Sequence, residues 1–373
     1  MTNPLTPNKP PTKSPTKSID PQDLFDIQSR FDQKFWNEYR GKRIFLTGGT
    51  GFFGKWLCES FVNLNERLRL GTELCVLTRN SQKFLSEMPH LKNREGLSFL
   101  DGDIRTFGSS DFCARFRADF IIHAATSTDV GFQATETIEM ISTVVDGTQS
   151  VLEYAQTVGT SRLLYISSGA VYGSPTPGAA HFEENCRTSP NPLDRNSAYG
   201  EAKRYAELLC TLYSGEAAQG SLKLPAGQLT AVIARCFAFL GPHLPLNAHF
   251  AVGNFISDGL KGETIRVNGD GTARRSYLYM SDLTAWLWYL LARGDAGFAY
   301  HVGSEASQSI EAIASRVAAA CGVSYAVAKK PEAGAQPSCY VPSTAVTRAK
   351  TGLAEWTSFD EALKKTIAWH KRG

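Results

Sequence analysis

The stretch Lys42-Arg-Ile-Phe-Leu-Thr-Gly-Gly-Thr-Gly-Phe-Phe-Gly-Lys-Trp-Leu57 decides the fold of this chain. Its apolar first part, Arg43 to Thr47, predicts a short buried strand, and glycines then recur at positions 48, 51 and 54 before a helical pattern begins. A strand, a glycine turn and a helix in this order predict a dinucleotide-binding element. Glycines let the backbone approach a pyrophosphate closely, and a helix start offers free N–H groups and a positive dipole end. The alternative is a tight turn that binds no ligand.

The composition of the 373 residues excludes several classes of protein. Lys and Arg number 39 against 36 Asp and Glu, and the net charge of +3 gives no strong attraction to nucleic acid. No apolar run reaches the ~18–20 residues that span a bilayer. The eight cysteines show no paired metal-ligand spacing, and several stand in apolar segments, as free thiols do in a reducing compartment. We therefore expect a globular cytoplasmic protein that uses no metal and no membrane.

The order of the predicted elements indicates one main domain and a smaller lobe. Residues 1–19 are rich in Pro, Thr and Lys and predict a disordered tail, whereas residues 20–40 predict an N-terminal helix. From 41 to 240 strands alternate with helices, which predicts an α/β fold, a Rossmann-type doubly wound parallel sheet. From 241 to 373 the alternation becomes irregular, and we expect mostly a smaller C-terminal substrate-binding α/β lobe. The predicted strands are 43–47, 73–79, 97–104, 120–125, 162–168 and 228–237, the longer predicted helices are 138–155, 199–213 and 359–370, and 214–227 and 331–342 are predicted loops.

The end of the second predicted strand bears on the choice of cofactor. In dinucleotide-binding folds a carboxylate at this place binds the ribose hydroxyls, but this chain has Thr78 and Arg79 there. An arginine suits a 2′-phosphate, so Arg79 favours NADP over NAD. The alternative is a solvated arginine at a strand end.

Two other features have structural interpretations. His123 ends the fourth predicted strand inside an apolar run, which predicts a structural histidine rather than a metal ligand or a base. Trp286 and Trp288 stand among apolar neighbours in a helical pattern, and we expect both in the core.

Tyr199 and Lys203 form the second decisive feature. They stand four residues apart at the start of a predicted helix, so both side chains lie on one face. A tyrosine normally loses its proton near pH ~10, and a neighbouring ammonium lowers the pKa by stabilising the phenolate. Ser168 ends the fifth predicted strand and supplies a hydroxyl donor at the same edge of the sheet. The three residues predict hydride chemistry on a secondary alcohol: Tyr199 takes the hydroxyl proton, Ser168 holds the oxygen and a nicotinamide takes the hydride.

From Gly41 to His370 the chain resembles the extended short-chain dehydrogenase/reductases, in particular the NAD(P)-dependent nucleotide-sugar epimerase/dehydratase family. The resemblance is specific for the family but not for one substrate. The motifs that carry it are Thr47-Gly-Gly-Thr-Gly-Phe-Phe-Gly54, Gly102-Asp103-Ile104, His123-Ala-Ala125, Ser167-Ser-Gly-Ala-Val-Tyr-Gly173, Tyr199-Gly-Glu-Ala-Lys203 and Gly269-Asp-Gly271 with Arg275-Ser-Tyr-Leu-Tyr279.

The resemblance implies a role for each matching residue. It implies Tyr199 as the acid/base, Lys203 as its partner and Ser168 as the oxygen donor in contact with the substrate. It also implies that Arg275 and Asn254 hold the diphosphate of a nucleotide-diphosphate sugar. A homodimer through the helices at 138–155 and 199–213 is implied as well. With the glycine turn and Arg79, the expected NAD(P)-binding residues are Gly48, Gly51, Phe52, Phe53, Gly54, Arg79, Asp103, Ile104, Ala124, Ala125, Thr126, Tyr199 and Lys203.

The chain departs from the family at one turn. Where the 4,6-dehydratases carry Thr-Asp-Glu, this chain has Ser168-Gly169-Ala170, so the acid and base that expel water are absent from these positions. The sugar-acid decarboxylases of the family also keep a glutamate at the position of Ala170. We therefore disfavour dehydratase and decarboxylase activity, and predict an NAD(P)-dependent nucleotide-sugar epimerase that acts through a transient 4-keto sugar.

Two other functions remain open. Arg79 favours an NADPH-dependent nucleotide-4-keto-sugar reductase, whereas a retained NAD would fit the epimerase. A non-catalytic cofactor-binding scaffold is the other alternative, against which stands the presence of the tyrosine, lysine and serine. Three asparagines usual in the family are replaced here by Val144, Ala238 and His301, so the nucleotide of the substrate stays unassigned.

Overall fold

The computed structural model describes residues 18–108, 110–126, 134–175, 178–214, 229–246 and 251–372. The predicted tail at 1–19 lies outside this range except for its last two residues. Of these, Ile19 is buried, and its backbone N–H donates to Glu59 Oε2 at 2.8 Å. The predicted loop at 214–227 also lies outside the described residues except for Ser214, which is buried.

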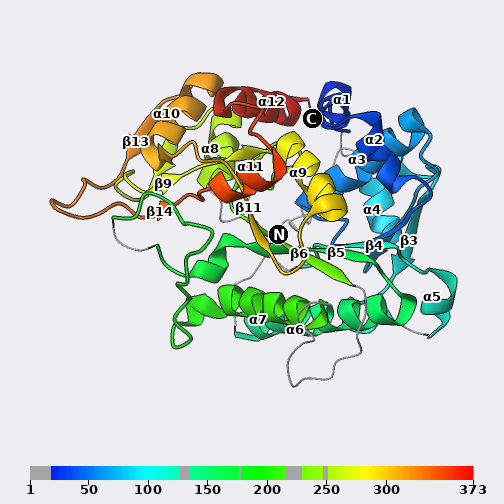
Figure 1. Cartoon of the computed structure of the whole chain (residues 1–373). Helices are drawn as coiled ribbons and strands as arrows, with labels where there is room; N and C mark the ends of the chain where they lie inside the picture. The colour runs from blue at the N-terminus through cyan, green and yellow to red at the C-terminus, as the bar shows by residue number, and fades with distance from the viewer. Residues whose placement is uncertain are drawn as a thin grey trace, which may run out of the picture.

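A seven-stranded sheet forms the centre of the molecule (Figure 1). Its spatial order is β11-β6-β5-β4-β1-β2-β3, and each neighbouring pair runs parallel. This order confirms the predicted doubly wound parallel sheet, in which the chain starts at the middle and builds outward in both directions. The strands are β1 (Arg43–Thr47), β2 (Glu73–Thr78), β3 (Leu97–Asp101), β4 (Phe120–His123), β5 (Arg162–Ser168), β6 (Thr230–Cys236) and β11 (Ala299–Val302).

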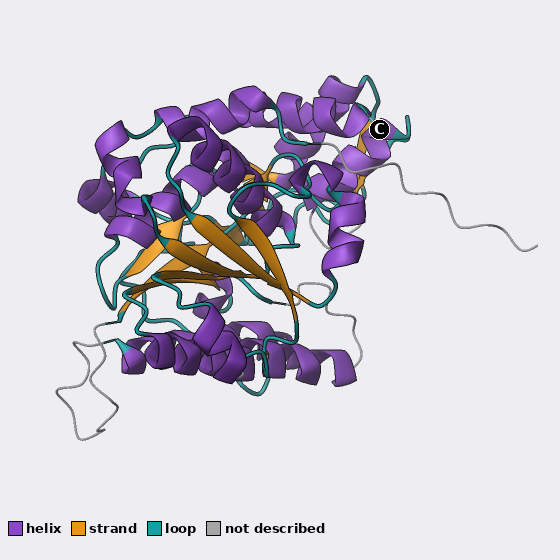
Figure 2. Cartoon of the chain, turned by 90° about the vertical axis from the view of Figure 1, so that its right-hand side faces the viewer, coloured by secondary structure: helices purple, strands orange, loops and turns teal. Residues whose placement is uncertain are grey.

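Helices cover both faces of the sheet, as Figure 2 shows. The side chains of β1 alternate between the two faces, so Ile44 and Leu46 join one hydrophobic core while Phe45 joins the other. The first core contains α3 (Phe52–Leu68) and α9 (Met280–Arg293), and the second contains α6 (Ala134–Val158) and α7 (Ala198–Tyr213). The expectation that Trp286 and Trp288 of α9 are core residues is confirmed, since both are buried.

Short helices lie before β1 and, besides the long helices α3, α6 and α7, between the strands. The predicted N-terminal helix is present as three pieces that pack on the first core through Ile27, Phe35 and Trp36. The short elements of this half are α1 (Pro21–Ser29), α2 (Gln33–Trp36), η1 (Asn37–Tyr39), α4 (Ser81–Glu87), η2 (Pro89–Leu91), α5 (Ser110–Arg115), η3 (Gly169–Tyr172) and η4 (Arg195–Ser197).

The chain after residue 240 contributes to both parts of the molecule. The helix α9 and the strand β11 belong to the layers of the main sheet, while the other elements form small sheets and helices beyond the ends of β5 and β6 (Figure 1). The division at residue 240 stays a prediction. The remaining elements are β7 (Phe239–Leu240), α8 (Ala251–Leu260), β8 (Ile265–Val267), β9 (Arg274–Arg275), β10 (Leu278–Tyr279), β12 (Gln308–Ser309), α10 (Ile310–Cys321), β13 (Tyr325–Val327), β14 (Cys339–Tyr340), α11 (Ala345–Thr351) and α12 (Phe359–Lys371).

Several element ends differ from the prediction. The third strand ends at Asp101 instead of 104, because a turn follows in which Thr106 N donates to the Asp103 carbonyl at 3.1 Å. The predicted loop at 331–342 contains the two-residue strand β14, which pairs with β9. None of the helices in the described ranges is long and apolar enough to cross a membrane. All eight cysteines are free, and the described residues contain no cluster of potential metal ligands.

His123 ties three elements of the core together. Its ring nitrogens contact two threonine hydroxyls, Nδ1 with Thr47 Oγ1 of β1 at 2.7 Å and Nε2 with Thr148 Oγ1 of α6 at 2.9 Å. Burial lowers the pKa of His123 to about 3, so the ring is neutral at physiological pH. The prediction of a structural histidine is confirmed.

Gly54→Ala tests the close packing of the turn between β1 and α3. A Cβ atom at Gly54 would lie 2.3 Å from the backbone of Gly49, so the turn would have to open. We expect the variant to lose about 1–3 kcal/mol of stability and to bind the dinucleotide more weakly, as measured by thermal unfolding and cofactor titration. Gly269→Ala is the matched control, because no atom lies within 4 Å of that Cβ position. Equal effects of the two substitutions would contradict this account.

The buried neutral His123 predicts a loss of stability in acid. The unfolded chain takes up a proton on this histidine near its ordinary pKa of ~6.5, whereas the folded chain does so only near 3. The stabilisation is therefore fully present above the unfolded value and is lost as the pH falls toward 3. We expect the melting temperature of His123→Gln, measured from pH 8 downward, to fall less steeply than that of the unchanged protein. Parallel curves would show that His123 does not contribute to the acid sensitivity.

Candidate active site

The glycine turn forms a cradle between β1 and α3. Gly48 has a φ of +72°, and a Cβ atom there would lie 2.5 Å from the backbone of Ala124. Gly51 is the N-cap of α3 and carries no side-chain cap, so no side chain closes the start of this helix. By contrast, a Cβ atom at Gly51 would come no closer than 3.4 Å to another atom. The turn therefore fits a diphosphate, which needs close backbone approach and free N–H groups at a helix start.

The predicted aromatic residues of this turn begin the helix. Phe52 and Phe53 are both half-buried, and Phe53 packs edge-on against Phe239 with ring centroids 5.0 Å apart. They link the cradle to the strand β7, which leads into the C-terminal lobe. The rings form part of the packing around the turn.

The ends of β2 and β3 bring Arg79 near Asp103. Asp103 accepts two hydrogen bonds from the Arg105 guanidinium, at 2.8 and 2.6 Å. This contact, with a smaller contribution from the positive charge of Arg79, lowers the pKa of Asp103 to about 2. Arg79 itself is exposed, whereas Ile104 is buried and packs close to Gly147 of α6. A carboxylate, two guanidinium groups and an apolar side chain thus lie at the edge where a nucleoside would end.

Residues 124–126 leave β4 beside the cradle. Ala124 N donates to the Thr47 carbonyl and Ala125 N donates to Thr47 Oγ1, each at 3.2 Å. The two bonds hold this segment against the end of β1. Thr126 then brings its hydroxyl beside the Tyr199 phenol, whose pKa it lowers in part. The segment therefore runs from the diphosphate cradle to the predicted catalytic tyrosine.

Tyr199, Ser168 and Lys203 come together at the carboxyl end of β5. The Ser168 hydroxyl lies beside the Tyr199 phenol and lowers its pKa in part. Lys203 Nζ lies 5.9 Å from the centre of the Tyr199 ring and 4.8 Å from that of Tyr165. It also donates to the Ile166 carbonyl at 2.8 Å. The start of α7 thus places both predicted side chains over the strand end that carries Ser168.

The charges of this cluster differ from the sequence expectation. Burial raises the pKa of Tyr199 to about 12, although the Ser168 hydroxyl lowers it in part. Burial also lowers the pKa of Lys203 to about 8. The ammonium was expected to lower the phenol's pKa, but removal of both groups from water is the larger effect here. Any ionisation of Tyr199 at neutral pH needs a further positive charge beside it.

A buried chain of polar contacts that the sequence did not predict lies behind Ser168. Ser167 Oγ donates to Glu207 Oε1 at 2.5 Å, and Arg235 donates to Glu207 Oε2 at 2.6 Å and to the Tyr172 hydroxyl at 2.7 Å. Tyr172 in turn contacts His301 Nε2 at 2.5 Å. The spacing of Glu207 four residues after Lys203 is the one sequence signal that could have suggested its place on the inner face of α7.

The turn after Ser168 is filled by two aromatic side chains. A Cβ atom at Gly169 would lie 2.6 Å from the Tyr340 hydroxyl and 2.7 Å from the Phe237 ring. Tyr340 comes from β14, inside the segment predicted as a loop, and its ring centroid lies 5.1 Å from that of Phe237. No pattern in the sequence predicted that β14 would bring a side chain to the end of β5.

The two predicted substrate residues take different places. Arg275 of β9 lies with its guanidinium carbon 5.8 Å from the centre of the Tyr340 ring, and so stands near the Ser168 turn. Asn254 is exposed on α8, a helix that packs mainly against α10 and β8. The structure therefore joins Arg275 to the cluster through Tyr340, while the role of Asn254 stays a prediction.

Relatives of known name cover most of the chain. A dTDP-glucose 4,6-dehydratase of Streptomyces niveus is 27% identical over 342 residues, which span 88% of this chain and 93% of the relative. A UDP-glucuronic acid decarboxylase of Xenopus tropicalis is 26% identical over 342 residues, which span 91% of this chain and 74% of the relative.

Solved structures share the fold. The dTDP-glucose 4,6-dehydratase DesIV of Streptomyces venezuelae, determined with NAD and TYD bound, has a TM-score of 0.72 at 23% identity and covers 89% of this chain and 97% of its own. A UDP-glucose 4-epimerase of Thermotoga maritima with UDP-glucose has a TM-score of 0.70 at 20% identity. The match covers 88% of this chain and 99% of the epimerase chain.

The predicted function needs correction. The sequence predicted an epimerase, with a reductase or a scaffold as alternatives, and disfavoured dehydratase and decarboxylase activity. Relatives over almost the whole chain carry those two disfavoured names, which contradicts the prediction. The inference rested on residues 168–170 alone. The structure packs Phe237 and Tyr340 from distant segments against the same turn, so those three residues do not define the groups at this place.

The family itself is established by a match over most of the chain. The sequence pattern of the NAD dependent epimerase/dehydratase family fits residues 44–303, from the first strand through the last strand of the main sheet. This range contains the glycine cradle, the Ser168 turn and the Tyr199–Lys203 helix. The chain belongs to the NAD dependent epimerase/dehydratase family.

Proposed function

We propose that this protein is an NAD-dependent lyase that acts on a nucleotide-diphosphate sugar. It oxidises a ring hydroxyl to a ketone, removes a group at the β position and then reduces the ketone again. The observation that carries the proposal is the convergence of Tyr199, Ser168 and Lys203 beside the glycine cradle. The names of the relatives over nearly the whole chain support elimination chemistry after the oxidation.

The residues present fit a nicotinamide dinucleotide. Gly48 and Gly54 leave no room for a side chain, and the uncapped start of α3 would hold the diphosphate. Residues 124–126 would lie along the cofactor toward Tyr199, and Asp103 with Ile104 would contact the adenosine. When bound, the cofactor supplies a hydride acceptor that also returns the hydride.

Three side chains divide the work on the sugar. Tyr199 takes the proton of the ring hydroxyl, and Ser168 donates a hydrogen bond to the same oxygen. Lys203, protonated at neutral pH, places a positive charge beside the phenol. This charge and that of an oxidised nicotinamide offset the burial that keeps Tyr199 protonated in the free protein.

Loss of carbon dioxide is the elimination that the site supports best. Expulsion of water needs a further acid that protonates the leaving hydroxyl, in addition to Tyr199, which acts on the ring oxygen. A carboxylate β to a ketone leaves as carbon dioxide without a proton. The electrons of the broken C–C bond form an enolate, whose oxygen contacts Ser168 and Tyr199. A proton then replaces the lost carboxylate on carbon, and reduction of the ketone returns the two electrons taken at the start.

The test is turnover of a panel of nucleotide sugars with NAD. Incubation with UDP-glucuronic acid, dTDP-glucose and UDP-glucose, followed by mass spectrometry, separates loss of carbon dioxide, loss of water and no change in mass. We expect loss of carbon dioxide from the sugar acid. Loss of water from a neutral sugar would overturn the choice of elimination, and no reaction across a panel that includes other bases would overturn the lyase proposal.

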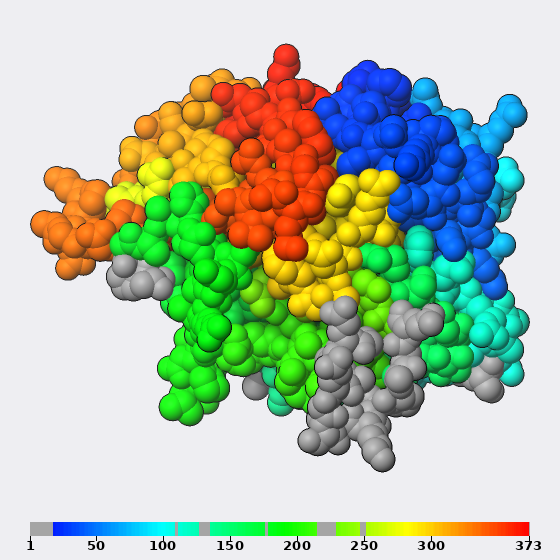
Figure 3. Space-filling model, in the orientation of Figure 1, coloured from blue at the N-terminus to red at the C-terminus, as the bar shows by residue number. Residues whose placement is uncertain are grey.

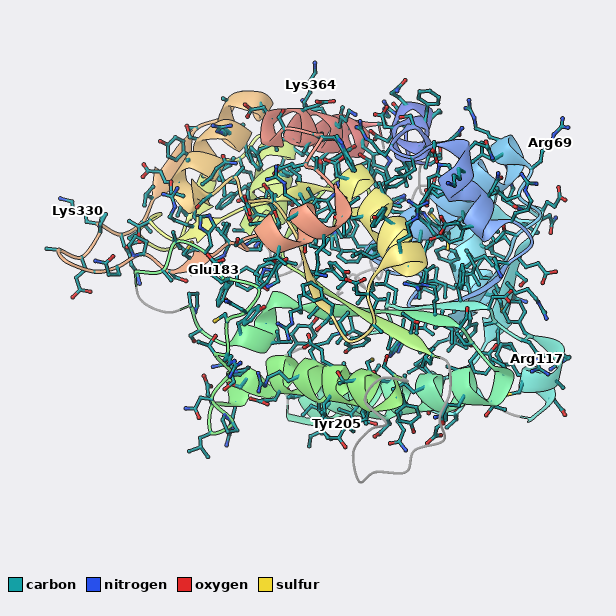
Figure 4. All side chains as sticks on the ribbon, in the orientation of Figure 1. Arg69, Arg117, Glu183, Tyr205, Lys330 and Lys364 are labelled. Atoms are coloured by element: carbon teal, nitrogen blue, oxygen red, sulfur yellow. The ribbon has the colours of Figure 1, made fainter. Side chains whose placement is uncertain are left out.

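Tyr199→Phe is expected to lower kcat by about 10²–10⁴-fold, because the ring hydroxyl then loses its proton acceptor. Folding and NAD binding should stay close to those of the unchanged protein, since the ring remains. Tyr205→Phe is the matched control, because Tyr205 is on the same helix but lies on its outer side (Figure 4) and is half-exposed. Normal turnover by Tyr199→Phe would remove this residue from the mechanism.

We also propose that Arg79 lets the protein accept NADP as well as NAD. The guanidinium lies exposed at the end of β2, near the Asp103 carboxylate, where an adenosine ribose would end. A 2′-phosphate could pair with it. We expect Arg79→Ala to weaken binding of NADP several-fold more than that of NAD, measured by titration of each cofactor. Arg67→Ala, at the far end of α3, serves as the control, and equal losses for NAD and NADP would exclude this role.

A homodimer remains part of the proposal. The helices α6 and α7 pack side by side on one face of the sheet, and three large apolar side chains on their outer surface, Ile138, Tyr205 and Leu208, are half or more exposed. A second copy would remove this apolar surface from water.

A further inference from the structure

Tyr340 reaches the candidate site from a distant part of the chain. Its strand β14 lies beside β9 (Figure 1) and pairs with it in parallel. The register of this pair places Tyr340 opposite Arg275. The next residue, Val341, accepts a hydrogen bond from Phe182 N at 2.8 Å. This bond fastens the segment to residues 180–184, and Figure 3 shows the two segments side by side, green against orange. The position of the Tyr340 ring is therefore defined from two sides.

The Tyr340 hydroxyl lies at the turn that carries Ser168. A Cβ atom at Gly169 would come within 2.6 Å of it, so the phenol occupies the space that a side chain at 169 would need. The ring packs on Phe237 and on Phe182, with centroids 5.1 and 5.9 Å apart. Its hydroxyl faces the Ser168 hydroxyl, which lowers the pKa of the Tyr340 phenol in part. Ser168 thus stands between two phenols, Tyr199 and Tyr340.

The hydrogen-bonding capacity of Ser168 limits what its proton can do. A serine hydroxyl has one proton to donate and two lone pairs to accept with. Ala170 N donates to Ser168 Oγ at 3.1 Å and uses one lone pair. A phenol that donates from Tyr340 uses the other. The only proton of Ser168 is then left for the side where Tyr199 and a sugar oxygen lie.

Tyr340 is suited to be that donor. Burial raises the pKa of its phenol well above the ordinary value, so the group stays neutral and keeps its proton over the working pH range. The charged or titratable groups that act on it are the Tyr199 phenol, the Cys236 thiol and the Arg275 guanidinium, and burial has the largest effect.

We propose that Tyr340 is a positioning residue, which donates a hydrogen bond to Ser168 and thereby commits the Ser168 proton to the reacting sugar oxygen. The inference rests on the proposed function, in which Ser168 contacts that oxygen. It assigns a part in the reaction to the C-terminal lobe. Because Tyr340 and Arg275 are paired across β14 and β9, the residue expected to bind the diphosphate and the residue that orients Ser168 belong to one small sheet.

Tyr340→Phe removes the hydroxyl and keeps the ring that packs on Phe237. We expect kcat to fall about 10-fold or more, since a donor to the developing oxyanion is no longer held in place, while KM and NAD affinity change little. Tyr340→His, which keeps a ring N–H donor, is expected to restore part of kcat. Tyr325→Phe, at an exposed tyrosine of β13 in the same lobe, is the control and should retain full activity. Full activity of Tyr340→Phe, or a loss confined to KM, would overturn the proposal.

A double-mutant cycle separates positioning from a general structural effect. If Tyr340 acts through Ser168, Tyr340→Phe lowers kcat in the unchanged protein but has no further effect in a Ser168→Ala background. The same fold-loss in both backgrounds would show that Tyr340 acts independently of Ser168. Thermal unfolding of each variant confirms that the comparison is made between folded proteins.

A measurement without substrate keeps this test separate from that of the proposed function. Tyr199 faces the Ser168 and Thr126 hydroxyls, the Cys236 thiol and Lys203. The ultraviolet absorbance of its phenolate can be isolated as the difference from Tyr199→Phe. When Tyr340→Phe frees Ser168 to turn away, the Tyr199 titration should move to higher pH. An unchanged titration would contradict the inference even if no sugar is turned over, whereas a shift without turnover would count only against the proposed function.

Discussion

Burial of the Lys203 ammonium is the constraint on which the candidate site depends. The side chain is only 1% exposed, and its nitrogen is held by the Ile166 carbonyl and the rings of Tyr165 and Tyr199. Burial of a charge without a paired carboxylate costs several kcal/mol in general terms. A chain keeps such an arrangement where the charge is needed, and clusters of perturbed groups of this kind concentrate at functional sites.

The main sheet could be predicted because its signals are local. β1 and β5 lie where their apolar runs and flanking glycines placed them, and β1 alternates its side chains between two cores. The ends of the strands were harder to predict, because each end depends on a few individual hydrogen bonds. The third strand stops at Asp101 because a turn follows, in which Thr106 N donates to the Asp103 carbonyl, a contact that no periodic pattern contains. The place of β11 beside β6 is equally non-local, since 62 residues separate the end of one strand from the start of the other.

The site was predictable only where its residues share one element. Tyr199 and Lys203 share a helix turn, and Gly48 to Gly54 share one turn with the start of α3, so spacing alone brought each group together. Tyr340 lies in the two-residue strand β14, which forms only by pairing with β9. The sequence around β14 resembles a loop, so the strand was not predicted. The prediction of function failed for the same reason. It used only the residues of the turn at Gly169, whereas Tyr340 and Phe237 from distant segments fill the space beside that turn. The pKa shifts of Tyr199 and Lys203 were not predicted either, because the burial of a side chain depends on the tertiary structure.

The position of the lobe within the chain has a mechanical consequence. The polypeptide leaves the main sheet at the end of β6, builds β9 and the helix α9, and returns to form β11 directly beside β6. It then leaves again to form β14 before its last helices. The lobe is therefore connected to the main sheet at two adjacent strands, β6 and β11, rather than through a single linker. Two connections restrict rotation of the lobe more than a single hinge would. The backbone itself therefore sets the distance between Tyr340 and Ser168.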